Sequence, residues 1–309
     1  MQQHKFSRRA WSKLMLTGFA GAVLPSALSA NAFSYKSSFV LGVQSYSLRD
    51  KPREEAIQIL KQLGVKSCEL WQGHIEPQEF QWARNITAEQ LKERQESLVK
   101  WKQQLDMKEI ATMYKQFKDA GIKIQAYSAN MNDNTSDHDV ELNFKIAKVL
   151  GTDTLTTSAT ITSMKRIDAY AQKYKIKVGM HNHSNVDRPN DFSTPESFQK
   201  AMEGCSSYTR INLDIGHFVA ANLDPVDFIK NNHDKIVCLH VKDRKKNQGV
   251  NVPFGEGDTP IKQVLELVRD NGWSIPANIE YEYGGADTKK ELGKCIQYCR
   301  DIIDRKIKK

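Results

Sequence analysis

Two patterns of apolar and polar positions alternate along the chain. Short apolar runs, typical of buried strands, are separated by longer segments in which apolar residues recur every three or four positions, as in amphipathic helices. The runs predict strands at 39–44, 65–71, 122–127, 152–157, 176–181, 211–214, 236–241 and 277–281. The segments between them predict helices at 51–63, 87–120, 139–150, 164–174, 195–202, 224–232, 260–271 and 288–306, the second of which should break into two helices near Asp106.

This order of elements predicts an α/β fold, a single (β/α)8 TIM barrel, as one catalytic domain at 33–309. Eight strands, each followed by a helix, are the pattern of that barrel. A doubly wound parallel sheet is the structural alternative. It would normally carry a glycine-rich phosphate turn after its first strand, and this sequence has none there.

Residues 1–32 have the layout of a signal peptide. Arg8 and Arg9 precede an apolar stretch at 14–30, and Ala30-Asn31-Ala32 offers a small-x-small cleavage site. The paired arginines resemble the twin-arginine export signal, with Trp11 where that pattern usually has Phe. We therefore expect an exported, periplasmic protein, with an ordinary secretory signal or an uncleaved anchor as the alternatives. No later apolar run is long enough for stable membrane insertion after the signal is removed.

Composition and charge narrow the function classes. Of the 309 residues, 27% are charged and 39% are hydrophobic, which predicts a globular protein with a full core. Loss of residues 1–32 removes four basic side chains and no acidic one, so the net charge falls from +8 to +4. This weak basicity gives no case for a nucleic-acid partner. The charged run at 242–246 is read as a solvated loop that could also attract an anionic substrate. The sequence leaves the oligomeric state undecided, and a homo-oligomer is possible.

The five cysteines have no zinc-type spacing. Cys68 and Cys238 lie in apolar strand-like runs and are read as small core residues. Cys295 and Cys299 are four positions apart on a predicted helix, where their side chains are neighbours. Export would permit disulfides, but the odd number leaves at least one cysteine, such as Cys205, unpaired.

Polar side chains gather where the last four predicted strands end. The runs are KVGMHNHS with His181 and His183, INLDIGHF with Asp214 and His217, IVCLHVKD with His240 and Lys242, and ANIEYE with Glu280 and Glu282. In a TIM barrel the chemistry lies at the carboxyl ends of the strands, and consecutive strands are neighbours. We therefore expect four of these side chains, His181, Asp214, His240 and Glu280, to form one cluster.

Two imidazoles and two carboxylates make a mixed nitrogen and oxygen site for a divalent metal. Mn, Co, Fe, Ni and Zn ions all suit such a set, and the sequence does not choose among them. Any one of these residues alone is more simply a hydrogen-bonded structural group. The metal site is predicted because four such residues fall in register on successive strands.

The motifs LDIGH, LHVKD, IEYE and GEGD (255–258) resemble the xylose isomerase-like sugar isomerase/epimerase superfamily, over nearly the whole chain from about Val40. CELWQGHIEP resembles exported members. The resemblance implies a metal-dependent barrel that acts on a carbohydrate, and matches Asp214, His240 and Glu280 to three of the family's four metal ligands. At the fourth position the epimerases usually carry a Glu that also shuttles a proton. This chain has His181 there, which puts the two-carboxylate proton exchange in doubt.

The chemistry that the resemblance leaves intact is proton abstraction next to a metal-polarised oxygen. It ends in isomerisation or epimerisation, or, if a group is lost from the next carbon, in a lyase or dehydratase reaction. The catalytic candidates are His217, whose family counterpart touches substrate, Lys242, as base or oxyanion partner, and Glu282. For Lys242 an ion pair with a neighbouring Glu is an equal alternative.

Six further residues are candidate substrate contacts: Glu69, Trp71, His74, Tyr127, His183 and Glu256. His183 is also an alternative metal ligand. Glu69 fits a structural hydrogen-bond acceptor equally well, and Tyr127, expected to stack on a sugar ring, is commonly a core residue at such a position.

Export favours a glycoside, an oligosaccharide or a keto-sugar over a phosphorylated intermediate. A keto group would acidify the neighbouring C–H and permit elimination of a glycosidic leaving group. Two rival classes remain. One is a sugar-binding barrel without turnover. The other is a metal-dependent endonuclease, because a DNA-repair family shares this barrel, although that family needs more metal ligands and a cationic groove.

Overall fold

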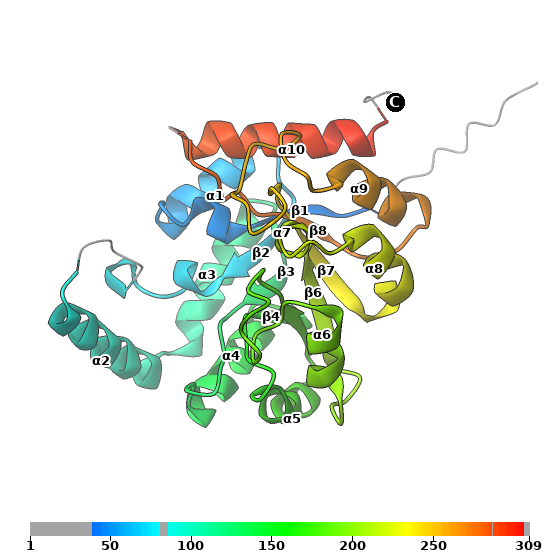
Figure 1. Cartoon of the computed structure of the whole chain (residues 1–309). Coiled ribbons are helices and arrows are strands. Elements are labelled where there is room, and N and C mark those ends of the chain that lie inside the picture. The colour runs from blue at the N-terminus through cyan, green and yellow to red at the C-terminus, as the bar shows by residue number, and fades with distance from the viewer. Residues whose placement is uncertain (1–38, 81–85, 286, 306–309) are drawn as a thin grey trace, which may run out of the picture. The chain divides into compact units, whose positions relative to one another are not determined.

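Eight parallel strands form a closed barrel in the order of the sequence, with β1 paired to β8 (Figure 1). The computed structural model describes residues 39–80, 86–285 and 287–305, so the predicted signal at 1–32 lies outside the described residues. The strands are β1 (Leu41–Gln44), β2 (Ser67–Trp71), β3 (Lys123–Ser128), β4 (Thr154–Thr157), β5 (Lys177–His181), β6 (Thr209–Asp214), β7 (Ile236–Val241) and β8 (Ala277–Ile279). The predicted fold class is confirmed.

Helices surround the barrel and cover the outer faces of the strands (Figure 1). They are α1 (Arg53–Gln62), α2 (Ala88–Gln104), α3 (Met107–Asp119), α4 (Asp137–Val149), α5 (Met164–Tyr174), α6 (Pro195–Met202), α7 (Ile215–Ala220), α8 (Pro225–Asn232), α9 (Ile261–Asp270) and α10 (Thr288–Ile303). The predicted break near Asp106 is present, because the Asp106 side chain caps α3 by accepting from the Lys108 amide. In the described part of the chain, no helix has the length and apolar character needed to cross a membrane.

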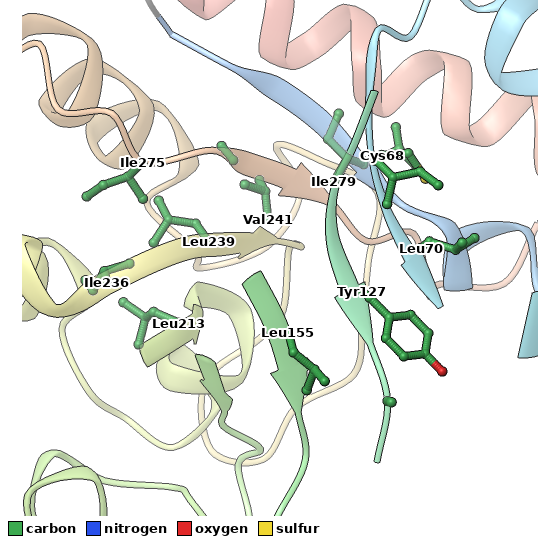
Figure 2. Packing of buried hydrophobic residues seen from close by; sticks show 14 of the residues in the cluster. Cys68, Leu70, Tyr127, Leu155, Leu213, Ile236, Leu239, Val241, Ile275 and Ile279 are labelled. Atoms are coloured by element: carbon green, nitrogen blue, oxygen red, sulfur yellow. The ribbon is translucent and has the colours of Figure 1, made fainter. Parts of the chain in front are cut away.

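The core lies between the strands and the helices. Strand residues such as Leu213, Leu239 and Val241 are fully buried and pack with residues of neighbouring strands (Figure 2). Because side chains alternate along a strand, the residues next to Leu213, namely Asn212 and Asp214, point into the barrel. Asn212 there contacts His240 of β7. The alternation therefore separates an apolar outer layer from a polar interior that leads to the site.

All five cysteines lie in the described residues and all are free. Cys68, Cys238, Cys295 and Cys299 are buried, and Cys205 is half-buried. The predicted core role of Cys68 and Cys238 fits their complete burial in β2 and β7.

The structure adds one helix that the sequence did not predict, α7, which starts directly from the end of β6. Asp214 serves as its N-cap, since its Oδ1 accepts a hydrogen bond from the His217 amide at 2.7 Å. Gly216 lets this helix approach β7, because a Cβ there would lie 2.4 Å from Cγ and 2.8 Å from the carbonyl oxygen of Lys242. Thus the LDIGH motif turns the chain at the barrel mouth and sets His217 beside Lys242.

Candidate active site

Four side chains at the carboxyl ends of β5 to β8 meet in one buried cluster. His181 ends β5, Asp214 ends β6, His240 lies near the end of β7, and Glu280 directly follows β8. One ligand atom from each lies within 4.8 Å of those of the other three. The structure therefore brings together the four residues that the sequence predicted to cluster. Strand β8 ends two residues earlier than expected, which places Glu280 and Glu282 on the loop that follows.

The geometry of this cluster suits a divalent metal. Nδ1 of His240 lies 3.0 Å from Oε2 of Glu280 and 4.0 Å from Oδ2 of Asp214. Nδ1 of His181 is buried and makes no hydrogen bond within the described residues, and the buried Oδ2 of Asp214 faces the Lys242 ammonium at 3.1 Å. A buried polar atom without a hydrogen bond is costly, and a bound cation would satisfy Nδ1 of His181. The residues present therefore fit the metal that the donor set implies.

The ammonium of Lys242 sits among the carboxylates of the cluster. Its Nζ lies 3.1 Å from Oδ2 of Asp214 and 2.8 Å from Oε2 of Glu280, and it also pairs with Glu282. Burial alone would lower the pKa of Lys242, but the three carboxylates outweigh it and raise that pKa well above its usual range. Lys242 is therefore a charged, ion-paired group, which favours the oxyanion partner over the base.

His217 projects from α7 between two cationic groups. Its Nδ1 lies 2.6 Å from Nη1 of Arg244, and its Nε2 lies 3.3 Å from Nζ of Lys242. Burial, and then the charge of Lys242, lower the pKa of His217 well below its usual range, so the ring is neutral. Guanidinium and ammonium groups can only donate, and a neutral imidazole accepts through one nitrogen only. The shorter contact, from Arg244 to Nδ1, assigns Nδ1 as the acceptor, which leaves the ring proton on Nε2, 4.0 Å from Oδ2 of Asp214. The imidazole therefore faces the cluster as a hydrogen-bond donor.

Three imidazoles form one wall of the site. The ring centroid of His183 lies 5.0 Å from that of His181 and 5.1 Å from that of His217. Burial is the main cause that lowers the pKa of His183 and of His181, so this wall is uncharged. One nitrogen from each ring also lies within 4.8 Å of the others. His183 thus stays available as a substrate contact.

Arg244 is a site residue that the sequence analysis missed. The run at 242–246 was expected to be a solvated loop, but only Lys245 and Lys246 are exposed. Nη1 of Arg244 donates to Ser184 Oγ at 3.1 Å as well as to His217, and its Nε donates to a backbone carbonyl at 3.0 Å. The signal was present in the sequence, since the two-residue repeat of His240 and Lys242 continues to Arg244.

The GEGD loop is held by a buried carboxylate. Oδ2 of Asp243 accepts from the amides of Gly255 and Gly257 at 2.8 and 3.0 Å. Glu256, predicted as a substrate contact, is exposed on this loop. The glycines on either side of Glu256 therefore anchor the GEGD loop to Asp243. The role of Glu256 as a substrate contact remains a prediction.

Glu69 does not line the substrate wall, contrary to expectation. It is fully buried inside the barrel, where Oε2 lies 2.9 Å from Nε2 of His240. The reason is depth: Glu69 comes two residues before the end of β2, one layer below the mouth. Trp71 ends the strand instead, half-buried, with its ring 5.0 Å from that of Tyr46 in an edge-to-face contact. Trp71 therefore stays a predicted substrate contact.

Two other predicted contacts are also buried away from the site. His74 is 1% exposed, and its Nδ1 lies 2.9 Å from the hydroxyl of Ser45. Burial lowers the pKa of His74 to about 4, so it is a neutral structural group. Tyr127, drawn in Figure 2, is 2% exposed. Its hydroxyl donates to Asn143 at 3.1 Å. Tyr127 therefore points to α4 on the outer side of β3, and His74 packs against the turn at 45–48, so these contacts support structural roles for both.

The chain was compared with known proteins. The model of one protein family, described as a xylose isomerase-like TIM barrel, matches residues 36–302. No curated protein is similar to the sequence.

Among solved structures, several share the fold at low sequence identity. The zinc-bound IOLI protein is 14% identical, with a TM-score of 0.63, covering 88% of this chain and 100% of that one. The 3-keto-D-glucoside 4-epimerase YcjR of E. coli is 10% identical, with a TM-score of 0.62 and coverage of 85% and 99%. The probable 3-DHS dehydratase AsbF of Bacillus anthracis is 16% identical, with a TM-score of 0.58 and coverage of 84% and 99%. At such identities the likeness concerns the fold.

Proposed function

This chain belongs to the xylose isomerase-like TIM barrel family, and on that premise we propose that it is a divalent-metal-dependent enzyme acting on a carbohydrate by proton abstraction. The observation that carries the proposal is the buried cluster of His181, Asp214, His240 and Glu280 within 4.8 Å. Nδ1 of His181 in that cluster is buried without a hydrogen bond, which supports a cation there. Zn, Mn, Co, Fe and Ni ions all accept such ligands.

When bound, the metal supplies Lewis acidity toward a carbonyl or hydroxyl oxygen and stabilises the negative charge of an enediolate. The residues of the chain supply the rest. The Lys242 ammonium and the Nε2 proton of His217 both point to where that charge develops, and serve as donors to the oxyanion. Neutral histidine acts as such an electrophile in other isomerases.

The proton acceptor is then Glu282. Of the three predicted catalytic residues, Lys242 is charged and His217 keeps its Nε2 proton, so neither has a free lone pair toward the substrate. The Glu282 carboxylate is half-buried and pairs with Lys242, on the same loop as Glu280. Glu282 takes the proton from the carbon next to the polarised carbonyl group. Returning it to the former carbonyl carbon, while a hydroxyl proton passes between the two oxygens, isomerises the sugar.

A lyase is the second candidate, and one observation favours it. Epimerisation requires a second acid/base group on the opposite face of the substrate, where the family usually carries a Glu at the end of strand five. Here that position holds His181, whose pKa burial lowers well below its usual range. Lys242 contacts both Glu282 and His217, which places these three groups on one side. Proton transfer on one face suits isomerisation, or elimination of a leaving group from a keto-sugar or glycoside.

The proposed substrate is a small carbohydrate. If residues 1–32 direct export to the periplasm, as the twin-arginine-like pattern predicts, glycosides and keto-sugars are more accessible there than phosphorylated intermediates. The half-buried ring of Trp71 at the end of β2 offers an apolar surface for a sugar ring. The three-imidazole wall offers neutral hydrogen-bonding groups for hydroxyls.

Elemental analysis of purified protein tests the metal site. The wild type should carry stoichiometric divalent metal, and Asp214→Ala and His240→Ala should carry almost none. The matched control His138→Ala removes an exposed imidazole and should keep its metal. A folded wild type without metal in metal-replete buffer would refute the proposed mechanism.

Turnover then separates the reaction classes. Metal-loaded protein is incubated in D₂O with free sugars and with 3-keto-glycosides, and the products are followed by NMR. Interconversion of free sugars with deuterium incorporation supports an isomerase, whereas release of the aglycone supports a lyase. Sugar binding without any product or exchange would instead make the chain a sugar-binding barrel.

A further inference from the structure

A layer of polar side chains lies inside the barrel, directly below the metal cluster. TIM-barrel interiors are usually filled by branched apolar residues. Here Glu69 is 0% exposed, and the polar side chains around it come from four other strands. They are Gln44 of β1, Thr156 of β4, His240 of β7 and Asn278 of β8. Burial of a carboxylate costs desolvation free energy, so Glu69 requires hydrogen-bond donors that compensate for it.

The contacts of Glu69 show that its carboxylate only accepts hydrogen bonds. Oε1 accepts from Thr156 Oγ1 at 2.5 Å and from Gln44 Nε2 at 3.3 Å. Oε2 accepts from Asn278 Nδ2 at 2.7 Å and faces Nε2 of His240 at 2.9 Å. The amide nitrogens of Gln44 and Asn278 can only donate, and an ionised carboxylate accepts from all of its partners. Nε2 of His240 must therefore carry the hydrogen of the fourth contact.

This arrangement determines which ring nitrogen of His240 faces the cluster. With a proton on Nε2, Nδ1 is the nitrogen that faces Glu280 and Asp214, 3.0 and 4.0 Å away, and it can bind a cation once its own proton is released. The amide of Asn212 also lies 3.0 Å from Nε2. If its nitrogen donated there, the ring proton would move to Nδ1 and block the metal position. The orientation of an amide is an assignment, and the carboxylate fixes it with oxygen toward Nε2.

We propose that Glu69 is a positioning residue that holds the proton of His240 on Nε2, and so presents Nδ1 to the metal. This inference rests on the proposed function, because it gives Glu69 a role in building the proposed metal site. Buried carboxylates that orient metal-binding histidines typically change metal affinity by 10 to 100-fold when they are replaced. This role fits the complete burial of Glu69 beside His240, one layer below the mouth of the barrel.

The substitution Glu69→Gln tests the role with little change of shape. A Gln amide can donate to Nε2, and would then favour the proton on Nδ1. We expect Zn²⁺ affinity, measured by competition with a chromogenic chelator, to fall by about 10 to 100-fold.

Asp168→Asn is the matched control. Asp168 is another buried carboxylate, whose four donors come from Gln172, Ser206 and Thr209, and it lies outside the cluster. Its Zn²⁺ affinity should stay within about 2-fold of wild type.

A second readout does not depend on affinity. In protein labelled with ¹⁵N-histidine, the wild-type His240 ring should show a proton on Nε2, both with and without Zn²⁺, and Glu69→Gln should lose it. The His240→Asn variant identifies the resonance. An unprotonated Nε2 in the wild type, or unchanged Zn²⁺ affinity in folded Glu69→Gln, would overturn the inference while leaving the proposed function intact. A wild type that binds no metal would refute the proposed function. The role of Glu69 would still be decided by comparing the Nε2 proton of His240 in metal-free wild type and metal-free Glu69→Gln.

Discussion

Nζ of Lys242 lies 2.8 Å from Oε2 of Glu280, the same carboxylate oxygen that lies 3.0 Å from Nδ1 of His240. The ammonium therefore contacts the oxygen that a metal would also need. Lys242 is 2% exposed and pairs with two further carboxylates, Asp214 and Glu282. One buried cation thus balances several buried anions of the candidate site. The stability of the metal-free protein should therefore depend on the positive charge of Lys242.

Replacing Lys242 by Met should destabilise the metal-free protein. Removing one partner of a buried ion pair typically costs about 3–5 kcal/mol, because it leaves buried charge without compensation. Divalent metal should restore part of this loss, since it would neutralise Asp214 and Glu280. Urea unfolding with and without Zn²⁺ measures both effects. Lys115→Met, which breaks an exposed pair with Asp119, is the control and should change little. Equal stability of Lys242→Met and wild type without metal would contradict the ion-pair interpretation.

Glu282→Gln should abolish most turnover while keeping the metal. If Glu282 is the proton acceptor, its loss should lower kcat by about 10² to 10⁴-fold. Metal content should remain close to wild type, because Glu282 is outside the four-residue cluster. Steady-state kinetics and elemental analysis of the same preparation check the two expectations. Full activity in Glu282→Gln would return the role of base to His217 or Lys242.

His217 should act through hydrogen-bond donation, and two substitutions separate this from proton abstraction. His217→Leu removes the donor and should lower kcat by about 10² to 10³-fold, the usual effect of losing an oxyanion donor. His217→Gln keeps an amide donor and should recover part of the rate. If both variants were equally inactive, His217 would be better described as a base.

His74 should make the protein sensitive to acid. Its pKa in the folded state is about 4, lowered by burial from an ordinary value of 6.5. The unfolded chain therefore binds a proton that the folded chain excludes, and stability falls as the pH drops from about 6.5 towards 4. The loss attributable to His74 should reach about 3 kcal/mol at pH 4.

Unfolding free energies at pH 7 and pH 4.5 test this for wild type and His74→Asn. The variant should lose less stability on acidification than the wild type does. His138→Asn, which replaces an exposed histidine, should follow the wild type. An identical pH dependence in His74→Asn would show that His74 is not the group responsible.

Asp168, in the middle of α5, should hold this helix to the loop before β6 and to the start of that strand. Its carboxylate accepts from the Ser206 amide at 2.9 Å and from the hydroxyls of Ser206 and Thr209 at 2.7 and 2.8 Å. Asp168→Ala leaves these buried donors unpaired and should cost about 3 kcal/mol of stability. Thermal unfolding measures the loss, with the exposed Asp153→Ala as control. Metal content should be unaffected, because the candidate site lies at the opposite end of β6, at Asp214.

Much of the architecture follows from local periodicity. The eight apolar runs predicted eight strands, and the order of strands and helices left a closed parallel barrel as the simplest arrangement. The two-residue repeat also placed His240 and Lys242 on one face, and the structure finds both at the site. The cluster of His181, Asp214, His240 and Glu280 was predictable because parallel strands in a barrel bring their carboxyl ends to one mouth.

Only the tertiary structure decided depth and partners. Alternation gives the face of a strand but not the layer, so Glu69 was expected at the substrate wall and lies beneath His240 instead. His74 and Tyr127 were misplaced because loops and the helix side of strands carry no period that marks the site. The charge state of Lys242 also depends on Asp214, Glu280 and Glu282, which come from other elements of the barrel. The sequence alone determined the barrel and the four polar residues that meet at its mouth, because both depend on local periodicity. Long-range contacts decided which hydrogen-bond and ion-pair partners each of these residues has.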